Sequence, residues 1–274
     1  MRYRQMNWGD LQNLREVLSL DYKDVGFFLG STKKRGPLNG SAGSAEPIES
    51  RELALLVRLL TQYPMYAVIG PRLSGPDLVN MFSDDFYNKY TTNGIVSLKS
   101  KIIKLSNLDN PSYEAKDALA KAALQLLHLY ETGGALFVRI QDHQFSGSLP
   151  ALGVEEKKRA AELEAALQKK SIRKGLPSVH PGKVSIILGK SNYYSGYNWA
   201  RDEQVNIPQV IQRLAVIVRR MIFDLGREGV WRYLLIVDED AFANGQSDGL
   251  ISLLEEKPSD RKGKEQKETE EMDS

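Results

Sequence analysis

The amino-acid sequence predicts a mainly α-helical protein with a few β-strands. Several segments repeat apolar residues at intervals of three and four, which is the spacing of one face of an α-helix. Proline and glycine stand where these segments begin and end, as they do at helix boundaries. Only two short runs, residues 135–141 and 230–237, are rich enough in β-branched and aromatic residues to predict strands.

The N-terminal region, residues 1–90, is predicted to be helical and to contain one long exposed loop. Residues 33–46 are rich in Gly, Ser, Ala and Pro, which is typical of a loop. Pro64 ends the strongest helix of the region, and Pro76 suits the first turn of the last one. The helices are expected over residues 11–18, from the Asp21 cap to 29, over 50–63 and over 74–82.

The rest of the chain divides into a helix-and-strand middle region, residues 91–175, a C-terminal region, residues 176–255, and a tail. The middle region has two predicted helices, and the second is charged and amphipathic, with i,i+4 pairs such as Glu155–Arg159. Residues 256–274 carry almost nothing apolar, so this tail is expected to be disordered. The remaining helices are expected over residues 110–130, 154–170 and 208–225, and the strands over 135–141 and 230–237.

Composition excludes several classes of protein. The chain has no cysteine, which rules out a disulfide scaffold, a thiolate zinc site and a cysteine nucleophile, and agrees with a reducing cytosol. No apolar run approaches the ~20 residues of a membrane span, and no secretory signal is expected because the sequence does not open with a basic and then apolar stretch. The tail carries seven acidic and five basic residues, a charge of −2, so the other 255 residues carry +4 of the total +2. A cytoplasmic protein that tolerates a nucleic-acid partner is expected.

The chain contains an internal repeat. The segment that follows Pro47 and the segment that follows Pro208 share the spacing P-x5-L-A-x2-V-R. Upstream of each, an apolar segment ends in Leu-Gly, at Leu29-Gly30 in the first unit and at Leu188-Gly189 in the second. The common order is an apolar segment, a glycine turn, a polar stretch and a proline-led helix. This is the order of elements in a helix-turn-helix, so the sequence predicts two diverged helix-turn-helix-like units.

Residues 14–32, LREVLSLDYKDVGFFLGST, resemble the start of the helix-turn-helix domain of phage Cro and repressor-type regulators. In that family a small residue lies within the second helix, here Gly26, and Leu-Gly followed by Ser or Thr opens the recognition helix. The segment 188–203, LGKSNYYSGYNWARDE, is similar to the turn and recognition helix of the same family. The resemblance covers about a fifth of the chain and implies binding of double-stranded DNA.

The two units differ in how well they match this family. In the first, Gly36-Pro37 interrupts the expected recognition helix, so only phosphate contacts are expected there. In the second, polar and aromatic side chains follow the turn, and Trp199 is expected to pack inward. The segment 183–188, which precedes that turn, is open to either a helix or a strand. The candidate DNA-binding residues are Lys33, Lys34, Arg35, Lys190, Asn192, Tyr193, Tyr194, Tyr197 and Arg201.

An NTPase is the sharpest rival hypothesis. Residues 188–191, LGKS, mimic the end of a phosphate-binding loop, and residues 233–240, YLLIVDED, mimic the strand and acidic pair that hold magnesium. The glycine that such a loop needs five positions earlier is replaced by Val184, which argues against it. His128, His143 and His180 are too far apart in the sequence to predict a metal site. No catalytic residue, cofactor or metal is therefore predicted.

The sequence favours a non-enzymatic DNA-binding protein, a transcriptional regulator of a bacterial or mobile genetic element. A related alternative is an accessory protein in plasmid or phage DNA transfer or replication. An alternative of a different class is a protein-interaction or assembly factor. The expected partners are double-stranded DNA and, as one option, a second copy of the chain in a homodimer, and no membrane is expected.

Overall fold

The structure is a computed structural model. Most of the residues it describes lie in α-helices, which confirms the predicted mainly helical fold class with few strands. The described residues are 3–20, 25–26, 28–29, 45–69, 72–83, 101–109, 112–116, 118–119, 138–139, 149–168, 179–202 and 205–255. The labelled helices are α1 (Trp8–Val17), α3 (Arg51–Gln62), the 3₁₀ helix η1 (Pro64–Tyr66), α4 (Gly75–Asn80), α8 (Val154–Leu167), α9 (Pro181–Ile187), α10 (Tyr194–Arg201), α11 (Gln209–Leu225), α12 (Arg227–Ala243) and α13 (Leu250–Leu254). Residues 101–106 are helical as well.

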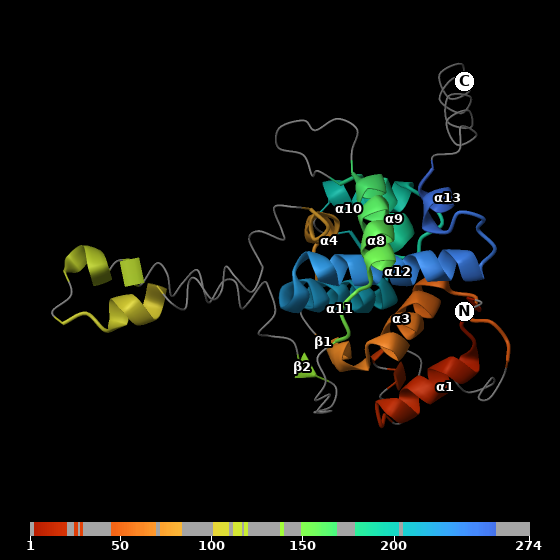
Figure 1. Ribbon diagram of the computed structural model, residues 1–274, viewed down its shortest axis with the longest axis horizontal. Coiled ribbons are helices and arrows are strands. Elements are labelled where there is room, and N and C mark those ends of the chain that lie inside the picture. Colours follow the sequence, from red (N-terminus) through yellow and green to blue (C-terminus); the bar gives the residue numbers. More distant parts are fainter. Residues whose placement is uncertain are drawn as a thin grey trace, which may run out of the picture.

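Helices α11 and α12 run through the middle of the molecule (Figure 1). Helix α3 packs against both of them and α1 packs on α3, while α4, α9 and α10 form a second group of neighbouring helices. Helix α8 crosses α12. Nearly all buried apolar side chains of the described residues from Met6 to Leu254 form one cluster, so the first and the last predicted regions share a core.

Serine caps, prolines and a glycine define the ends of several helices. The Ser50 hydroxyl accepts a hydrogen bond from the Leu53 amide at 3.3 Å and caps α3, and Pro64 follows the end of that helix. The Ser74 hydroxyl caps α4 in the same way. Helices α11 and α12 are joined by Gly226 alone, whose φ of 61° lies in the left-handed region that favours glycine. These signals set the bounds of the predicted helices to within a few residues.

The predicted strand over residues 135–141 is confirmed for its two described residues. Strand β1 (Val68–Ile69) pairs antiparallel with strand β2 (Val138–Arg139), with Val68 opposite Arg139 and Ile69 opposite Val138. Of the predicted helix over 110–130, residues 113–116 and 118–119 are helical, Ser112 precedes them without being helical, and the remainder lies outside the described residues. The tail over 256–274 also lies outside them.

The prediction of a strand over residues 230–237 was wrong, because this run lies inside helix α12. Its apolar side chains lie all around the helix: Val230, Tyr233, Leu234 and Val237 are fully buried and Ile236 is nearly so, while Trp231 and Leu235 on the remaining side are partly buried. Helices α3, α8, α11 and α13 all pack on α12. A helix enclosed by neighbours has no polar face, so its sequence resembles the continuous apolar run of a buried strand. The strand required by the NTPase hypothesis is therefore not formed.

Helix α8 begins where the sequence predicted and is bound to the core rather than free on the surface. Ala160, Leu163 and Leu167 are buried, and α8 packs on α12. The predicted pair between Glu155 and Arg159 is not formed. Instead the Arg159 guanidinium binds both carboxylate oxygens of Asp238 in α12, each at 2.9 Å. A bidentate ion pair with the buried Asp238 is stronger than a surface pair with Glu155, which explains why Arg159 binds Asp238.

A second polar contact fixes α8 against α12. Glu164 is only 3% exposed, and its carboxylate accepts hydrogen bonds from Arg227 and from the indole of Trp231, the latter at 2.8 Å.

Within the part of the chain that the structure describes, no helix combines the length and apolarity that crossing a bilayer requires.

Candidate functional site

The second repeat unit forms two short helices joined by a turn. Helix α9 is capped by the His180 ring, which accepts a hydrogen bond from the Lys183 amide. The helix ends at Leu188, and Gly189, with φ of +93°, redirects the chain. This settles the open prediction for residues 183–188, of which all but the capping Leu188 are helical. The Asn192 side-chain oxygen then accepts from the Ser195 amide at 3.1 Å and stabilises the first turn of α10.

Glycine residues allow α10 to lie very close to its neighbours. A Cβ atom at Gly196 would lie 1.8 Å from the Pro181 carbonyl oxygen in α9, and one at Gly75 in α4 would lie 2.3 Å from the Trp199 carbonyl oxygen. Trp199 is 3% exposed, which confirms that it packs inward. Helix α10 is therefore clamped between α9 and α4, with its inner face fixed.

The outer side of this unit carries three of the predicted DNA-binding residues. Tyr194 is 60% exposed, and Arg201 and Asn192 are exposed as well. Tyr194 and Arg201 are seven residues apart in the sequence, which puts them on the same side of a helix, two turns from each other. Asn192 stands just before α10, at the end from which the helix amides point outward.

Three other predicted DNA-binding residues make intramolecular contacts. The Lys190 ammonium lies 2.8 Å from the Glu52 carboxylate of α3. The Tyr193 hydroxyl donates to the Leu253 carbonyl at 3.4 Å, and the Tyr197 hydroxyl lies 3.1 Å from Nε2 of the His180 ring. These side chains hold the turn and α10 against the body of the protein. Sequence reasoning missed these partners because Glu52 and Leu253 are far away in the chain, and His180 is 17 residues before Tyr197, at the N-terminal cap of α9.

The contact between Lys190 and Glu52 sets the ionisation of the carboxylate. Burial acts to raise the pKa of Glu52, but the hydrogen bonds from Lys190, from its own amide and from Ser50 together outweigh it. The pKa therefore lies below its ordinary value, and Glu52 is a carboxylate at neutral pH. The turn between α9 and α10 is thus joined to α3 by an ion pair.

The remaining predicted residues, Lys33, Lys34 and Arg35, lie outside the described residues. Just before them, Val25, Gly26, Phe28 and Leu29 are buried, and the first three of these are helical. The Phe28 carbonyl accepts a hydrogen bond from Nε of Arg213 in α11 at 3.1 Å. The apolar segment of the first unit is therefore hydrogen-bonded to helix α11 of the second unit.

These contacts are reciprocal with respect to the internal repeat. Glu52 and Arg213 hold the same position in the two copies of the repeat, directly before Leu-Ala. Glu52 contacts the end of α9, since its Cα would lie 2.8 Å from a Cβ at Gly189. Arg213 in turn binds the Phe28 carbonyl at the end of the first unit's apolar segment. Each unit therefore contacts the end of the other unit's apolar segment.

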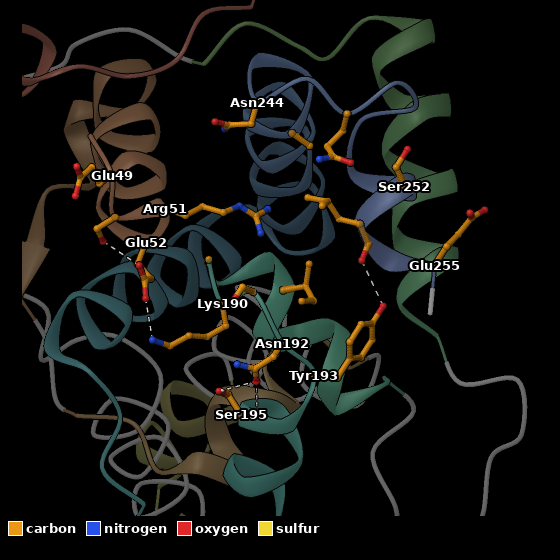
Figure 2. Close-up of a pocket in the computed structure, with 17 residues that line it drawn as sticks. Glu49, Arg51, Glu52, Lys190, Asn192, Tyr193, Ser195, Asn244, Ser252 and Glu255 are labelled. Carbon is orange, nitrogen blue, oxygen red and sulfur yellow. Dashed lines mark hydrogen bonds and ion pairs between the residues drawn. The ribbon is translucent and has the colours of Figure 1, made fainter. Parts of the chain in front are cut away.

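A cavity of about 760 Å³ adjoins the turn between α9 and α10 (Figure 2). It is bounded by the start of α3, by residues 189–195 and by the segment that links α12 to α13. Among the described residues, no group of three His, Asp or Glu side chains is arranged to hold a metal ion.

Comparison with known proteins gives no relative from which a site could be transferred. No protein-family model matches the chain, and no curated protein or solved structure matches it either. The geometry of the chain itself is therefore the basis for any functional assignment.

Proposed function

We propose that this protein binds double-stranded DNA, as a transcriptional regulator of a bacterial or mobile genetic element. The observation that supports this most is the outward face of α10, where Tyr194 and Arg201 are exposed on a helix clamped from behind, with Asn192 exposed just before the helix begins. Asn and Arg side chains bind base edges and phosphates, and a rigid short helix is the element that presents them to a major groove.

The six other predicted residues take different parts in this proposal. Lys33, Lys34 and Arg35 neutralise phosphates, as the sequence predicts for a basic segment beside the first unit. Lys190, Tyr193 and Tyr197 position α10 through the Glu52, Leu253 and His180 contacts, and act on DNA binding through that helix.

Fluorescence anisotropy with duplexes selected from a random pool tests the proposal. We expect Tyr194→Ala and Arg201→Ala to reduce the preference for the selected sequence over random duplex. Tyr113→Ala is the matched control, because Tyr113 is 84% exposed but lies far away in the sequence. Lys33→Ala/Lys34→Ala should weaken binding to all sequences and lower the salt slope by about two. If the wild-type chain binds no duplex at low salt, the proposal is wrong.

The alternative is a protein-interaction or assembly factor. The internal contacts of Lys190, Tyr193 and Tyr197 favour it, because side chains used to build a helix pair are not available to a groove. Salt distinguishes the two functions. Binding to DNA weakens steeply as salt is added because counterions are released, whereas an apolar protein interface responds weakly.

A further inference from the structure

Residues 101–109, all of which the structure describes, stand apart from the core of the molecule. Figure 1 shows this part of the chain in yellow, well away from the helices that surround α12. None of these residues is buried, whereas every labelled helix contains at least one buried residue. Their apolar side chains neither belong to the core cluster of the described residues nor pack against it. The core therefore does not cover the apolar side chains of this segment.

The segment has four large apolar residues and only a short helix. Ile103 is 59% exposed and Leu108 is 44% exposed, while Ile102 and Leu105 are half-buried. Only residues 101–106 are helical, and an isolated helix shorter than about 12–15 residues is marginal in water. Helices in proteins are stabilised mainly by packing of an apolar face, which the core does not provide here. A partner that covers these side chains would supply that packing.

The charges and apolar residues of the segment are arranged to complement a second copy. Lys101 begins the segment and Asp109 ends it, and both are exposed. When two identical segments lie antiparallel about a two-fold axis, residues at equal distances from the centre are opposite each other. With Leu105 at the centre, Lys101 of one copy is opposite Asp109 of the other. In the same register Ile102 is opposite Leu108, so that apolar side chains meet as well.

We propose that two copies of this chain associate through residues 101–109, antiparallel about a two-fold axis that passes at Leu105. Charge favours a second copy over a nucleic acid, because the Asp109 carboxylate would be repelled by phosphates but is opposite Lys101 in the dimer. An interface formed by so short a segment is that of a weak, reversible dimer. The proposal does not rest on DNA binding, although a dimer would present two α10 helices to one duplex.

Sedimentation velocity of the full-length chain, at a series of concentrations and without DNA, tests the proposal. We expect the mass of the wild-type protein to rise from one chain to two as the concentration increases. Ile103→Asp places a charge in the apolar contact and should raise the dimer dissociation constant by about tenfold or more. Val154→Asp is the matched control, because Val154 is an 82% exposed apolar residue that belongs to α8. Because Ile103 lies outside the core cluster, the urea unfolding curves of both variants should remain cooperative.

Two charge-reversal variants test the antiparallel arrangement. Lys101→Glu and Asp109→Lys each place like charges opposite each other, so each variant alone should associate more weakly than the wild-type protein. In a mixture of the two, opposite charges meet at both ends of the segment, and the variants should bind each other in preference to themselves. The chain has no cysteine, so Val154→Cys added to one variant carries a fluorophore with which the mixed dimer is measured.

The possible results separate the parts of the proposal. A wild-type chain that stays a monomer at every concentration overturns it. A dimer that Ile103→Asp leaves unchanged also overturns it, because the two copies then meet elsewhere. A dimer that Ile103→Asp weakens, but whose charge-reversed variants do not prefer each other, overturns the antiparallel arrangement. Absence of duplex binding refutes the proposed function alone, since these measurements contain no DNA.

Discussion

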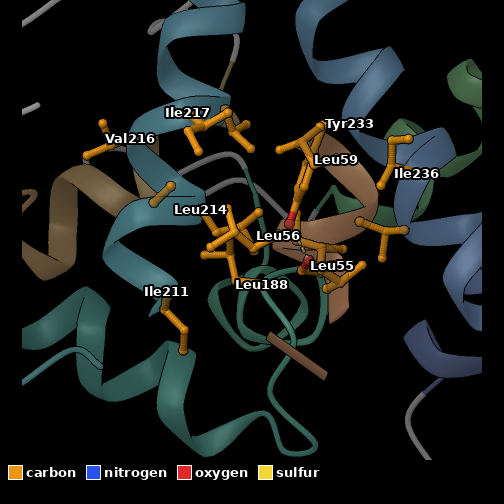
Figure 3. Packing of buried hydrophobic residues seen from close by; sticks show 14 of the residues in the cluster. Leu55, Leu56, Leu59, Leu188, Ile211, Leu214, Val216, Ile217, Tyr233 and Ile236 are labelled. Carbon is orange, nitrogen blue, oxygen red and sulfur yellow. Dashed lines mark hydrogen bonds between the residues drawn. The ribbon is translucent and has the colours of Figure 1, made fainter. Parts of the chain in front are cut away.

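Helices α3 and α11 carry the same sequence pattern, and comparing them shows what the pattern does and does not determine. In both, the Leu-Ala pair and the later Val are buried, and Arg58 and Arg219, which end the pattern, are each 6% exposed. The two helices pack on each other, and Figure 3 shows Leu56 of α3 toward Leu214 of α11 and Leu59 toward Tyr233 of α12. The repeated spacing therefore gives the same buried face in both units.

The units differ in the position just before Leu-Ala. Glu52 forms a part-exposed ion pair with Lys190, whereas Arg213 is 7% exposed and binds a backbone carbonyl. The beginnings of the helices differ too, because Ser50 caps α3 with its side chain and α11 has no side-chain cap. The apolar spacing determines the buried core, and the position before Leu-Ala determines the polar contacts between the two units. Substitutions in the core should therefore have the largest effect on stability, and substitutions of these polar contacts smaller ones.

Leu56→Ala in α3 and Ile217→Ala in α11 should destabilise the protein about equally. The two residues hold corresponding positions and both are fully buried. Removing either side chain should lower the free energy of unfolding by about 2–5 kcal/mol, measured by urea denaturation. Val154→Ala is the control, since Val154 is 82% exposed. A large inequality between the two core variants would show that the two helices are not equally embedded.

Gly189→Ala should break the contact by which the first unit holds the second. The residue has φ of +93°, and a Cβ would lie 2.8 Å from the Glu52 Cα. The strain of a left-handed alanine is on the order of 1–3 kcal/mol. Gly245→Ala is a matched control with φ of +82° and nothing within 4 Å of the added atom. The excess loss in Gly189→Ala measures the contact itself, and equal losses would mean that the contact is not tight.

Arg213→Met should break the reverse contact while keeping most of the apolar stem. The Phe28 carbonyl then loses its hydrogen bond in a buried place, which costs about 1–3 kcal/mol in unfolding free energy. Arg220→Met is the comparison, because its i,i+4 pair with Asp224 is part-exposed and of little energetic weight. Similar values for the two variants would contradict the role assigned to Arg213.

Glu52→Gln should have the smallest effect, about 0.2–1 kcal/mol at neutral pH. The pKa of Glu52 is lowered by the folded state, so its contribution is present at neutral pH and is lost as the pH falls through that lowered value. The wild-type and variant unfolding curves should therefore converge below pH ~4.3, the ordinary value for glutamate. A difference that persists in acid would mean that Glu52 acts through packing instead of charge.

The helices whose polar and apolar residues separate were predictable from the sequence. Ser50 and Pro64 bracket α3, Ser74 and Pro76 begin α4, and the spacing of Leu163 and Leu167 indicates the inner side of α8. Helix α12 was not predictable, because helices on all its sides remove the polar face that local reasoning needs. The inward position of Trp199 was predicted correctly, because its large apolar ring stands among polar residues of the sequence such as Asn198 and Arg201.

The candidate site was predictable as a segment but not as a surface. The sequence indicated residues 188–201 as a turn and a helix, and the structure has both. It gave no sign that Lys190 pairs with Glu52 or that Tyr193 reaches Leu253, because these partners are far away in the chain. The cavity was invisible for the same reason, as residues 49–52, 189–195 and 241–255 meet only in the folded protein.

Because Trp199 is buried in α10, its fluorescence reports the packing of that helix. The chain has three tryptophans, and they lie in separate parts of the molecule, with Trp8 in α1, Trp199 in α10 and Trp231 hydrogen-bonded to α8. Replacing Trp8 and Trp231 by Phe leaves emission from α10 alone. A blue-shifted spectrum then reports an intact α9–α10 pair, and a red shift reports its release to water. Any surface variant of α10 can thus be checked for local integrity in the same cuvette in which its ligands are titrated.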